Sequence, residues 1–221
     1  MKCVAWALPL LVIVGVASSA NASTDMDVCV GQTAAIERIG ACSRAIESGL
    51  SGDELIKAHT ARGIAYGRVG QIDSGLEDLG VAIKAAPDRP GLWIARARLH
   101  FNKGEHDPAM LDLAEAIKLD AKNALPVNLM GQNHFMLGNY DIALKFFDQA
   151  IAMDPNDYNA FVNRATTYYR TNKLPDALRD VNAAYLILPP GDSRARGLVE
   201  LKRAIESAYA SQQGAQPAAS Q

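Results

Sequence analysis

The sequence is poor in the residues and motifs on which most catalytic and metal sites depend. Its 221 residues include three cysteines and four histidines, and it contains no P-loop, HExxH, G-x-S-x-G or G-x-G-x-x-G motif. Only His100 and His134 form a suggestive pair, and no further ligand recurs beside them. We interpret both as structural and predict a protein that is not an enzyme and uses no cofactor or metal. A hydrolytic function, which would require a cluster of polar residues, is a further alternative.

An excess of charge of either sign is also missing. The chain has 22 lysines and arginines against 24 aspartates and glutamates, a formal net charge of -2. Such a chain lacks the basic surface that nucleic acids and anionic membranes require. Outside the N-terminus, no segment is apolar enough to cross a bilayer. We therefore expect no nucleic-acid partner and no stable membrane insertion.

The N-terminus carries the pattern of a secretory signal peptide. Lys2 precedes a short apolar stretch over residues 4–16, and small residues follow, with Ala20 and Ala22 at the -3 and -1 positions of a cleavage site. We predict cleavage after Ala22, removal of residues 1–22, and a periplasmic or secreted protein. An uncleaved membrane anchor is the alternative. The remaining chain of about 200 residues suits one domain or one continuous array.

Two cysteines, Cys29 and Cys42, remain after cleavage. An even number of cysteines in an exported protein favours a disulfide. Two cysteines without a neighbouring histidine are too few for a structural metal site, which usually has four ligands. We predict a Cys29–Cys42 disulfide, with a pair of buried thiols as the alternative.

The chain contains a sequence pattern that repeats every 34 residues. The repeats span residues 56–89, 90–123, 124–157 and 158–191. Small residues occupy repeat positions 8, 20 and 27, and large residues occupy positions 11 and 24. Position 8 is Gly63, Ala97, Gly131 and Ala165, and position 24 is Leu79, Leu113, Phe147 and Val181. Small residues let two helices approach closely, and large residues fill the space between them.

Each repeat has the signals of two helices joined by a turn. Gly70, Gly104 and Gly138 stand at position 15, where a glycine can end a helix in the left-handed conformation. In these repeats an aspartate follows three residues later, and a carboxylate favours a helix N-terminus. The fourth repeat has Asn172-Lys173 at the turn instead. The period therefore predicts a helix–turn–helix unit in every repeat.

This pattern resembles the tetratricopeptide repeat (TPR) family over residues 56–191. The resemblance implies an all-α fold, an α-solenoid of four helix-turn-helix units, and extends to exported proteins of Gram-negative bacteria. Before the repeats, residues 23–55 form a cap with a partial repeat. Its residues 33–48 are expected to be a lone helix, with the disulfide replacing a missing first helix. After the repeats we expect a capping helix over 192–211 and a disordered tail over 212–221.

Positions 7 and 23 of the repeat vary together. Arginine at position 7 accompanies aspartate at position 23 in three repeats: Arg62 with Asp78, Arg96 with Asp112, and Arg164 with Asp180. The remaining repeat loses both and has Met130 with Phe146. We predict that the two positions touch, as ion pairs in three repeats and as an apolar contact in the remaining one.

By resemblance to the family, the first helix of each repeat lines a concave groove. The expected groove residues are Arg98, Phe101, Asn128, Gln132, Phe135, Asn163, Thr166, Tyr169 and Arg170. The aromatic side chains would be apolar anchors, the amides and the threonine would bond to a peptide, and the arginines would favour an acidic ligand. Alternatively, the aromatic residues belong largely to the core.

From these expectations we predict that the protein is a non-catalytic scaffold or adaptor of the bacterial envelope. Its groove would hold a peptide or a helix of a protein partner. The alternative is a structural, self-associating solenoid without a dedicated peptide ligand, and a homo-oligomer is compatible with either function.

Overall fold

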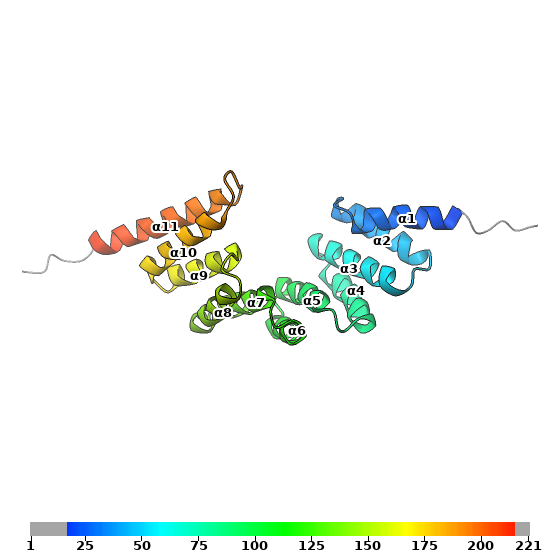
Figure 1. The fold of residues 1–221 in the computed structure, drawn as a ribbon, viewed down its shortest axis with the longest axis horizontal. Helices are drawn as coiled ribbons and strands as arrows, with labels where there is room; N and C mark the ends of the chain where they lie inside the picture. The colour runs from blue at the N-terminus through cyan, green and yellow to red at the C-terminus, as the bar shows by residue number, and fades with distance from the viewer. Residues whose placement is uncertain (1–16, 215–221) are drawn as a thin grey trace, which may run out of the picture. The chain divides into compact units, whose positions relative to one another are not determined.

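A computed structural model describes residues 17–214 of the chain, with the side chains of residues 23–213. This part of the chain forms eleven helices and no strand. It divides into two compact parts, an N-terminal part up to Pro87 and a C-terminal part from Asp88 onward. Figure 1 shows each part as helices stacked in chain order. The predicted all-α fold is confirmed.

The N-terminal part consists of α1 (Ala17–Val30), α2 (Ala35–Glu47), α3 (Gly52–Arg68) and α4 (Ile72–Ala85). Helix α1 packs against α2 and α3, α2 packs against α3, and α3 packs against α4. The helix predicted over 33–48 is α2, but the expectation that it lacks a first helix is wrong.

Helix α1 is that first helix, and it escaped sequence analysis because its apolar content is low. Cleavage after Ala22 would remove the residues 17–22 from α1 and leave 23–30. Residues 1–16 of the predicted signal peptide lie outside the described residues.

The C-terminal part contains three helix pairs and one further helix. The pairs are α5 (Pro90–Lys103) with α6 (His106–Leu119), α7 (Ala124–Met136) with α8 (Tyr140–Met153), and α9 (Tyr158–Arg170) with α10 (Leu174–Ile187). Helix α11 (Ala195–Gly214) packs on α10. It continues three residues into the segment 212–221 that we expected to be disordered, and the rest of that segment lies outside the described residues.

The core of each pair combines a small residue at position 8 with a larger one at position 24. In the third repeat, a Cβ on Gly131 would stand 2.5 Å from Cε1 of Phe147, so only glycine fits opposite the ring. In the second repeat, Ala97 has room for its methyl group beside the smaller Leu113, and both are buried in one cluster. In these two repeats the residue sizes at the two positions therefore compensate one another, as a close-packed interior demands.

The turns inside the pairs use the left-handed backbone conformation. Gly104 has a φ of 81°, and its N–H donates to Phe101 O over 3.0 Å while Glu105 N donates to His100 O over 2.9 Å. This pair of hydrogen bonds closes a helix that ends in a glycine. In the fourth repeat Asn172 takes the same conformation with a φ of 61°, which asparagine tolerates better than most residues.

Candidate functional site

Buried ion pairs join the two helices of three repeats. Nε and Nη2 of Arg96 donate to the two carboxylate oxygens of Asp112 over 2.8 and 2.7 Å. The same two-pronged contact joins Arg62 to Asp78 and Arg164 to Asp180, at 2.7–2.8 Å and 2.7 Å. The hydrogen bonds that each arginine donates to the buried carboxylate raise the pKa of the arginine. The predicted pairing of positions 7 and 23 is confirmed for these three repeats.

The third repeat, which lacks the ion pair, is built differently. The Phe146 ring stacks on His134, with ring centroids 5.3 Å apart and planes 7° from parallel. Its contact with Met130 stays a prediction. Nδ1 of His134 is buried without a hydrogen-bond partner among the described residues. Stacking on an aromatic ring agrees with the structural role that we gave to this histidine.

His100, the other histidine of the suggestive pair, lies in a polar cluster at the end of α5. Its Nδ1 is 2.7 Å from Oε2 of Glu105, whose Oε1 is 2.7 Å from Nζ of Lys103. Hydrogen bonds from Lys103 and then from His100 hold the pKa of Glu105 below its usual value. Among residues 23–213, no group of three or more histidine, cysteine or acidic side chains is arranged to hold a metal ion.

The predicted disulfide is present. Sγ of Cys29 and Sγ of Cys42 are bonded, and their Cα atoms are 4.8 Å apart. The bond joins the last turn of α1 to the middle of α2, where both side chains are fully buried. Nε of Arg38 donates to the Cys29 carbonyl over 3.1 Å, so the end of α1 has a second attachment to α2.

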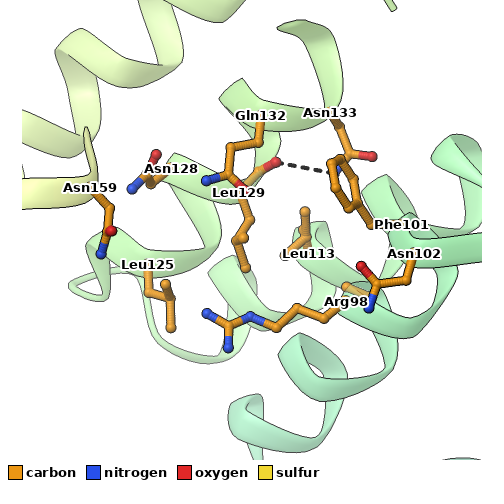
Figure 2. A pocket seen from close by; sticks show the side chains of 11 residues that line it. Arg98, Phe101, Asn102, Leu113, Leu125, Asn128, Leu129, Gln132, Asn133 and Asn159 are labelled. Carbon is orange, nitrogen blue, oxygen red and sulfur yellow. Dashed lines mark hydrogen bonds between the residues drawn. The ribbon is translucent and has the colours of Figure 1, made fainter. Parts of the chain in front are cut away.

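A pocket of about 310 Å³ opens in the C-terminal part between the first helices of its repeats. Its walls come from α5, α7 and α9, with Leu113 of α6 behind them (Figure 2). It brings together four of the nine predicted groove residues: Arg98, Phe101, Asn128 and Gln132. The other lining residues are Ala97, Asn102, Leu113, Leu125, Leu129, Asn133 and Asn159.

One wall of the pocket is apolar and carries a single cation. Leu125, Leu129 and the ring of Phe101 line this wall, with Leu129 between the other two in the view, and the Arg98 side chain extends toward Leu125 (Figure 2). Phe101 packs against the cluster of Ala97, Ala109 and Leu113 and meets His106 edge-on at 5.6 Å, so it is partly core. Arg98 is exposed, and the described lining residues include no carboxylate to neutralise it.

The pocket amide of Asn128 is committed to hydrogen bonds within the protein itself. Asn128 is 2% exposed, donates from Nδ2 to Asp157 Oδ2 over 3.0 Å, and accepts from Asn163 Nδ2 over 2.9 Å. Asp157 in turn caps the N-terminus of α9. Asn128 and Asn163 therefore hold α7 against α9 in place of the free ligand contacts that we expected.

Asn133 acts in the same way on the other side of α7. It is 2% exposed, and its Nδ2 donates to Leu129 O over 3.1 Å (Figure 2). Its Oδ1 is 3.0 Å from Nδ1 of His106. The amides of Asn102, Gln132 and Asn159 line the pocket with no side-chain hydrogen bond to any described residue. These three amides and Arg98 are the polar groups that remain available to a ligand.

The remaining predicted groove residues lie outside this pocket. Phe135 is half-buried against Tyr140, with ring centroids 5.5 Å apart, and Tyr169 packs partly against the core of α9 to α11. The hydroxyl of Thr166 donates to the Val162 carbonyl of its own helix over 2.8 Å. Arg170 is exposed at the end of α9.

Leu129 and Asn133 line the pocket although sequence analysis did not choose them. With Leu125 they stand at intervals of four residues, which places them on one face of α7. This spacing was visible in the sequence, but the family resemblance directed attention to other positions. None of the helices in residues 17–214 is long and apolar enough to cross a membrane.

Comparison with known proteins agrees with this architecture. Human tetratricopeptide repeat protein 13 is 29% identical over 136 residues, which covers 59% of this chain and 16% of that protein. Protein PHOX3 of Arabidopsis thaliana is 32% identical over 113 residues, covering 48% of this chain and 14% of the relative. The chain thus spans less than a fifth of the length of these curated relatives.

Solved structures with the same fold include a thermophilic TPR protein of Thermus thermophilus, with a TM-score of 0.64 at 16% identity over 87% of this chain and 99% of the other. PilF of Pseudomonas aeruginosa has a TM-score of 0.66 at 13% identity, over 89% and 91% of the two chains. YrrB, described as a TPR protein with an unusual peptide-binding site, has a TM-score of 0.57 at 17% identity, over 86% and 88%.

The sequence model of the tetratricopeptide repeat family matches residues 60–124 and 128–193, more than half of the chain. Proteins built from this repeat generally mediate protein–protein interactions and are typically non-catalytic scaffolds. The paired helices, their left-handed turns and this match together show that the chain belongs to the tetratricopeptide repeat family.

Proposed function

We propose that the pocket between α5, α7 and α9 binds an extended peptide segment of a protein partner and that the protein works as a non-catalytic adaptor. The observation that carries this proposal is Arg98, an exposed cation beside an apolar wall in a pocket without a carboxylate. An acidic side chain of a peptide would neutralise it, and a neighbouring apolar side chain would cover Leu125 and Leu129.

The free amides fit an extended backbone. Asn102, Gln132 and Asn159 come from three different helices and can each donate and accept hydrogen bonds. A peptide that runs across the three helices would find a partner for its N–H and C=O groups at each step. The structurally similar YrrB is described as having a peptide-binding site, which supports a ligand of this class.

Selection from a random peptide library displayed on phage tests the proposal. We expect the immobilised protein to enrich peptides in which aspartate or glutamate is next to a leucine-like residue. Arg98→Glu should abolish the preference for an acidic residue and weaken the binding of the selected peptides by about 2 kcal/mol. Lys145→Glu, at an exposed lysine of α8, makes the same charge change outside the pocket and serves as the control. Equal selection by both variants would overturn the assignment of Arg98.

We also propose that the adaptor works in the periplasm of a Gram-negative bacterium. The N-terminal pattern supports export, and the Cys29–Cys42 disulfide suits an oxidising compartment. Cell fractionation and N-terminal sequencing of the expressed chain test this directly. We expect Ser23 as the first residue of the periplasmic protein, whereas recovery in the cytoplasm with Met1 retained would contradict it.

A further inference from the structure

The last helix pair exposes apolar residues that the repeat does not require. At repeat position 28 the first three repeats have Ile83, Ile117 and Ile151, which are buried or half-buried, whereas the fourth has Tyr185. At position 29 they have Lys84, Lys118 and Ala152, whereas the fourth has Leu186. Tyr185 is 54% exposed and Leu186 is 84% exposed. Exposed apolar groups of this size beside one another mark an interaction surface.

These two residues stand at the edge of an open pocket between α10 and α11. The pocket is about 300 Å³ and is lined by Val181, Asn182, Leu198, Val199 and Lys202 in addition to Tyr185 and Leu186. At the preceding junction, between α8 and α9, an arginine spans the helices. Nη1 of Arg164 contacts Asp148 at 2.6 Å while Nε of Arg164 contacts Asp180 at 2.7 Å.

Asn182 occupies the repeat position of Asp148, but α11 contributes only Val199 and Lys202 to the pocket beside the buried Leu198. The junction of α10 and α11 therefore lacks a bridging side chain like Arg164, which spans the junction of α8 and α9.

Helix α11 continues this surface along its length. Val199, Lys202, Glu206 and Tyr209 follow one another at intervals of three, four and three residues, which places them on one face. Val199 and Tyr209 are exposed, whereas Leu198 and Ile205 on the neighbouring face are buried in the core. Lys202 Nζ and Glu206 Oε1 are 3.9 Å apart within the helix, and both side chains remain accessible.

We propose that a second copy of the chain docks antiparallel along this face of α11. The face is complementary to itself about residue 204. Lys202 and Glu206 lie two residues on either side of it, and Val199 and Tyr209 lie five residues on either side. A two-fold axis at residue 204 therefore places Lys202 opposite Glu206 of the second copy, and Val199 opposite Tyr209 of the second copy, twice each.

This register also closes the open pocket. Tyr209 of the second copy arrives beside Val199, at the rim formed by Tyr185 and Leu186, and its ring can enter the space between α10 and α11. A parallel arrangement in register would instead place each charge against its own like, which is unfavourable. The docking surface shares no residue with the peptide pocket, so the proposal does not rest on peptide binding.

Sedimentation equilibrium of the full exported chain tests the proposal. We expect a reversible dimer for the wild type. Lys202→Glu and Glu206→Lys each place like charges together twice, and each should raise the dissociation constant of the dimer at least about tenfold. Leu186→Gln should weaken the dimer as well. Lys145→Glu and Leu111→Gln are the matched controls, because Leu111 is 71% exposed on α6, away from this surface.

Mixing the two charge variants gives the sharpest result. Lys202→Glu on one copy and Glu206→Lys on the other restore opposite charges across the axis at both contacts, so a heterodimer should form where neither variant forms a homodimer. Mixing does not restore the Lys202–Glu206 pair within either helix. Recovery of the dimer would therefore show an effect on docking and not on helix stability. A wild type that remains monomeric at about 1 mM overturns the proposal. So does a dimer that responds to the charge variants no more than to Lys145→Glu.

Discussion

Arg96 and Asp112 show how much a single pair of residues contributes to a repeat. The carboxylate is almost fully buried and the guanidinium is three-quarters buried, and two hydrogen bonds join them. A buried carboxylate without its cation is strongly unfavourable, since it has lost water and gained no partner. The third repeat has replaced both charges by Met130 and Phe146, so the chain itself contains the apolar alternative.

We predict that Arg96→Met destabilises the protein by about 3 kcal/mol because it strands Asp112. The double variant Arg96→Met/Asp112→Phe, which copies the third repeat, should recover most of that loss. Urea denaturation followed by circular dichroism measures both. Arg98→Met on the same helix, at an exposed position, should change stability little. A double variant that is as unstable as the sum of its single changes would show that the two sites are not coupled.

The close packing of Gly131 against Phe147 can be tested by substitution. Its Cβ would stand 2.5 Å from the Phe147 ring, so Gly131→Ala should overpack the core and cost about 1–3 kcal/mol. Gly80 lies inside α4 with nothing within 4 Å of its Cβ direction, so Gly80→Ala should stabilise the helix by about 0.5–1 kcal/mol. Thermal unfolding of the two variants should therefore shift in opposite directions. Similar shifts for both would mean that the Phe147 ring moves aside freely.

The element that depends most on one bond is α1. It ends at Val30, one residue after Cys29, and its last turn is tied to α2 by the disulfide and by Arg38. Its sequence favours a helix only weakly, so its order comes chiefly from these attachments and from packing on α2 and α3. A cross-link at such a place limits the freedom of the unfolded segment.

We predict that Cys42→Ser releases α1, with a loss of about 3 kcal/mol in the local stability of the first helix pair. Hydrogen exchange read by mass spectrometry should show faster exchange in residues 23–47. Peptides from residues 88–214 should exchange as in the wild type and provide the internal control. Uniform protection of α1 in the variant would mean that packing alone holds this helix.

The two proposed binding surfaces lie on different helices of the molecule. The peptide pocket uses α5, α7 and α9, and the docking face uses α10 and α11. A protein with both would present two peptide pockets per dimer and gain avidity for a partner with two such segments.

We therefore predict that the two functions separate by mutation. Arg98→Glu should lose peptide selection and still sediment as a dimer, and Lys202→Glu should become monomeric and still bind the selected peptide. Fluorescence anisotropy with a labelled peptide and sedimentation of the same samples measure both properties together. Loss of both functions in either variant would show that the surfaces are coupled.

The repeat architecture follows from the amino-acid sequence alone. The 34-residue spacing of small and large residues and the joint variation of positions 7 and 23 were sufficient for the helix pairs, the turns and three ion pairs. These features rest on contacts between neighbouring helices, which recur once in every period and so leave a periodic record in the chain. The disulfide could likewise be predicted from the two cysteines and the predicted export signal.

Which polar groups are free became clear only from the packing of the folded chain. Asn128 and Gln132 stand one helical turn apart on α7, yet Asn128 is consumed by Asp157 and Asn163 while Gln132 faces the pocket. The packing also showed that α1 completes the first helix pair and that Tyr185 and Leu186 remain uncovered. The physical reason is that exposure depends on how helices distant in sequence rotate and pack against one another. Repeat positions that are equivalent in the sequence therefore acquire different surroundings in the folded chain.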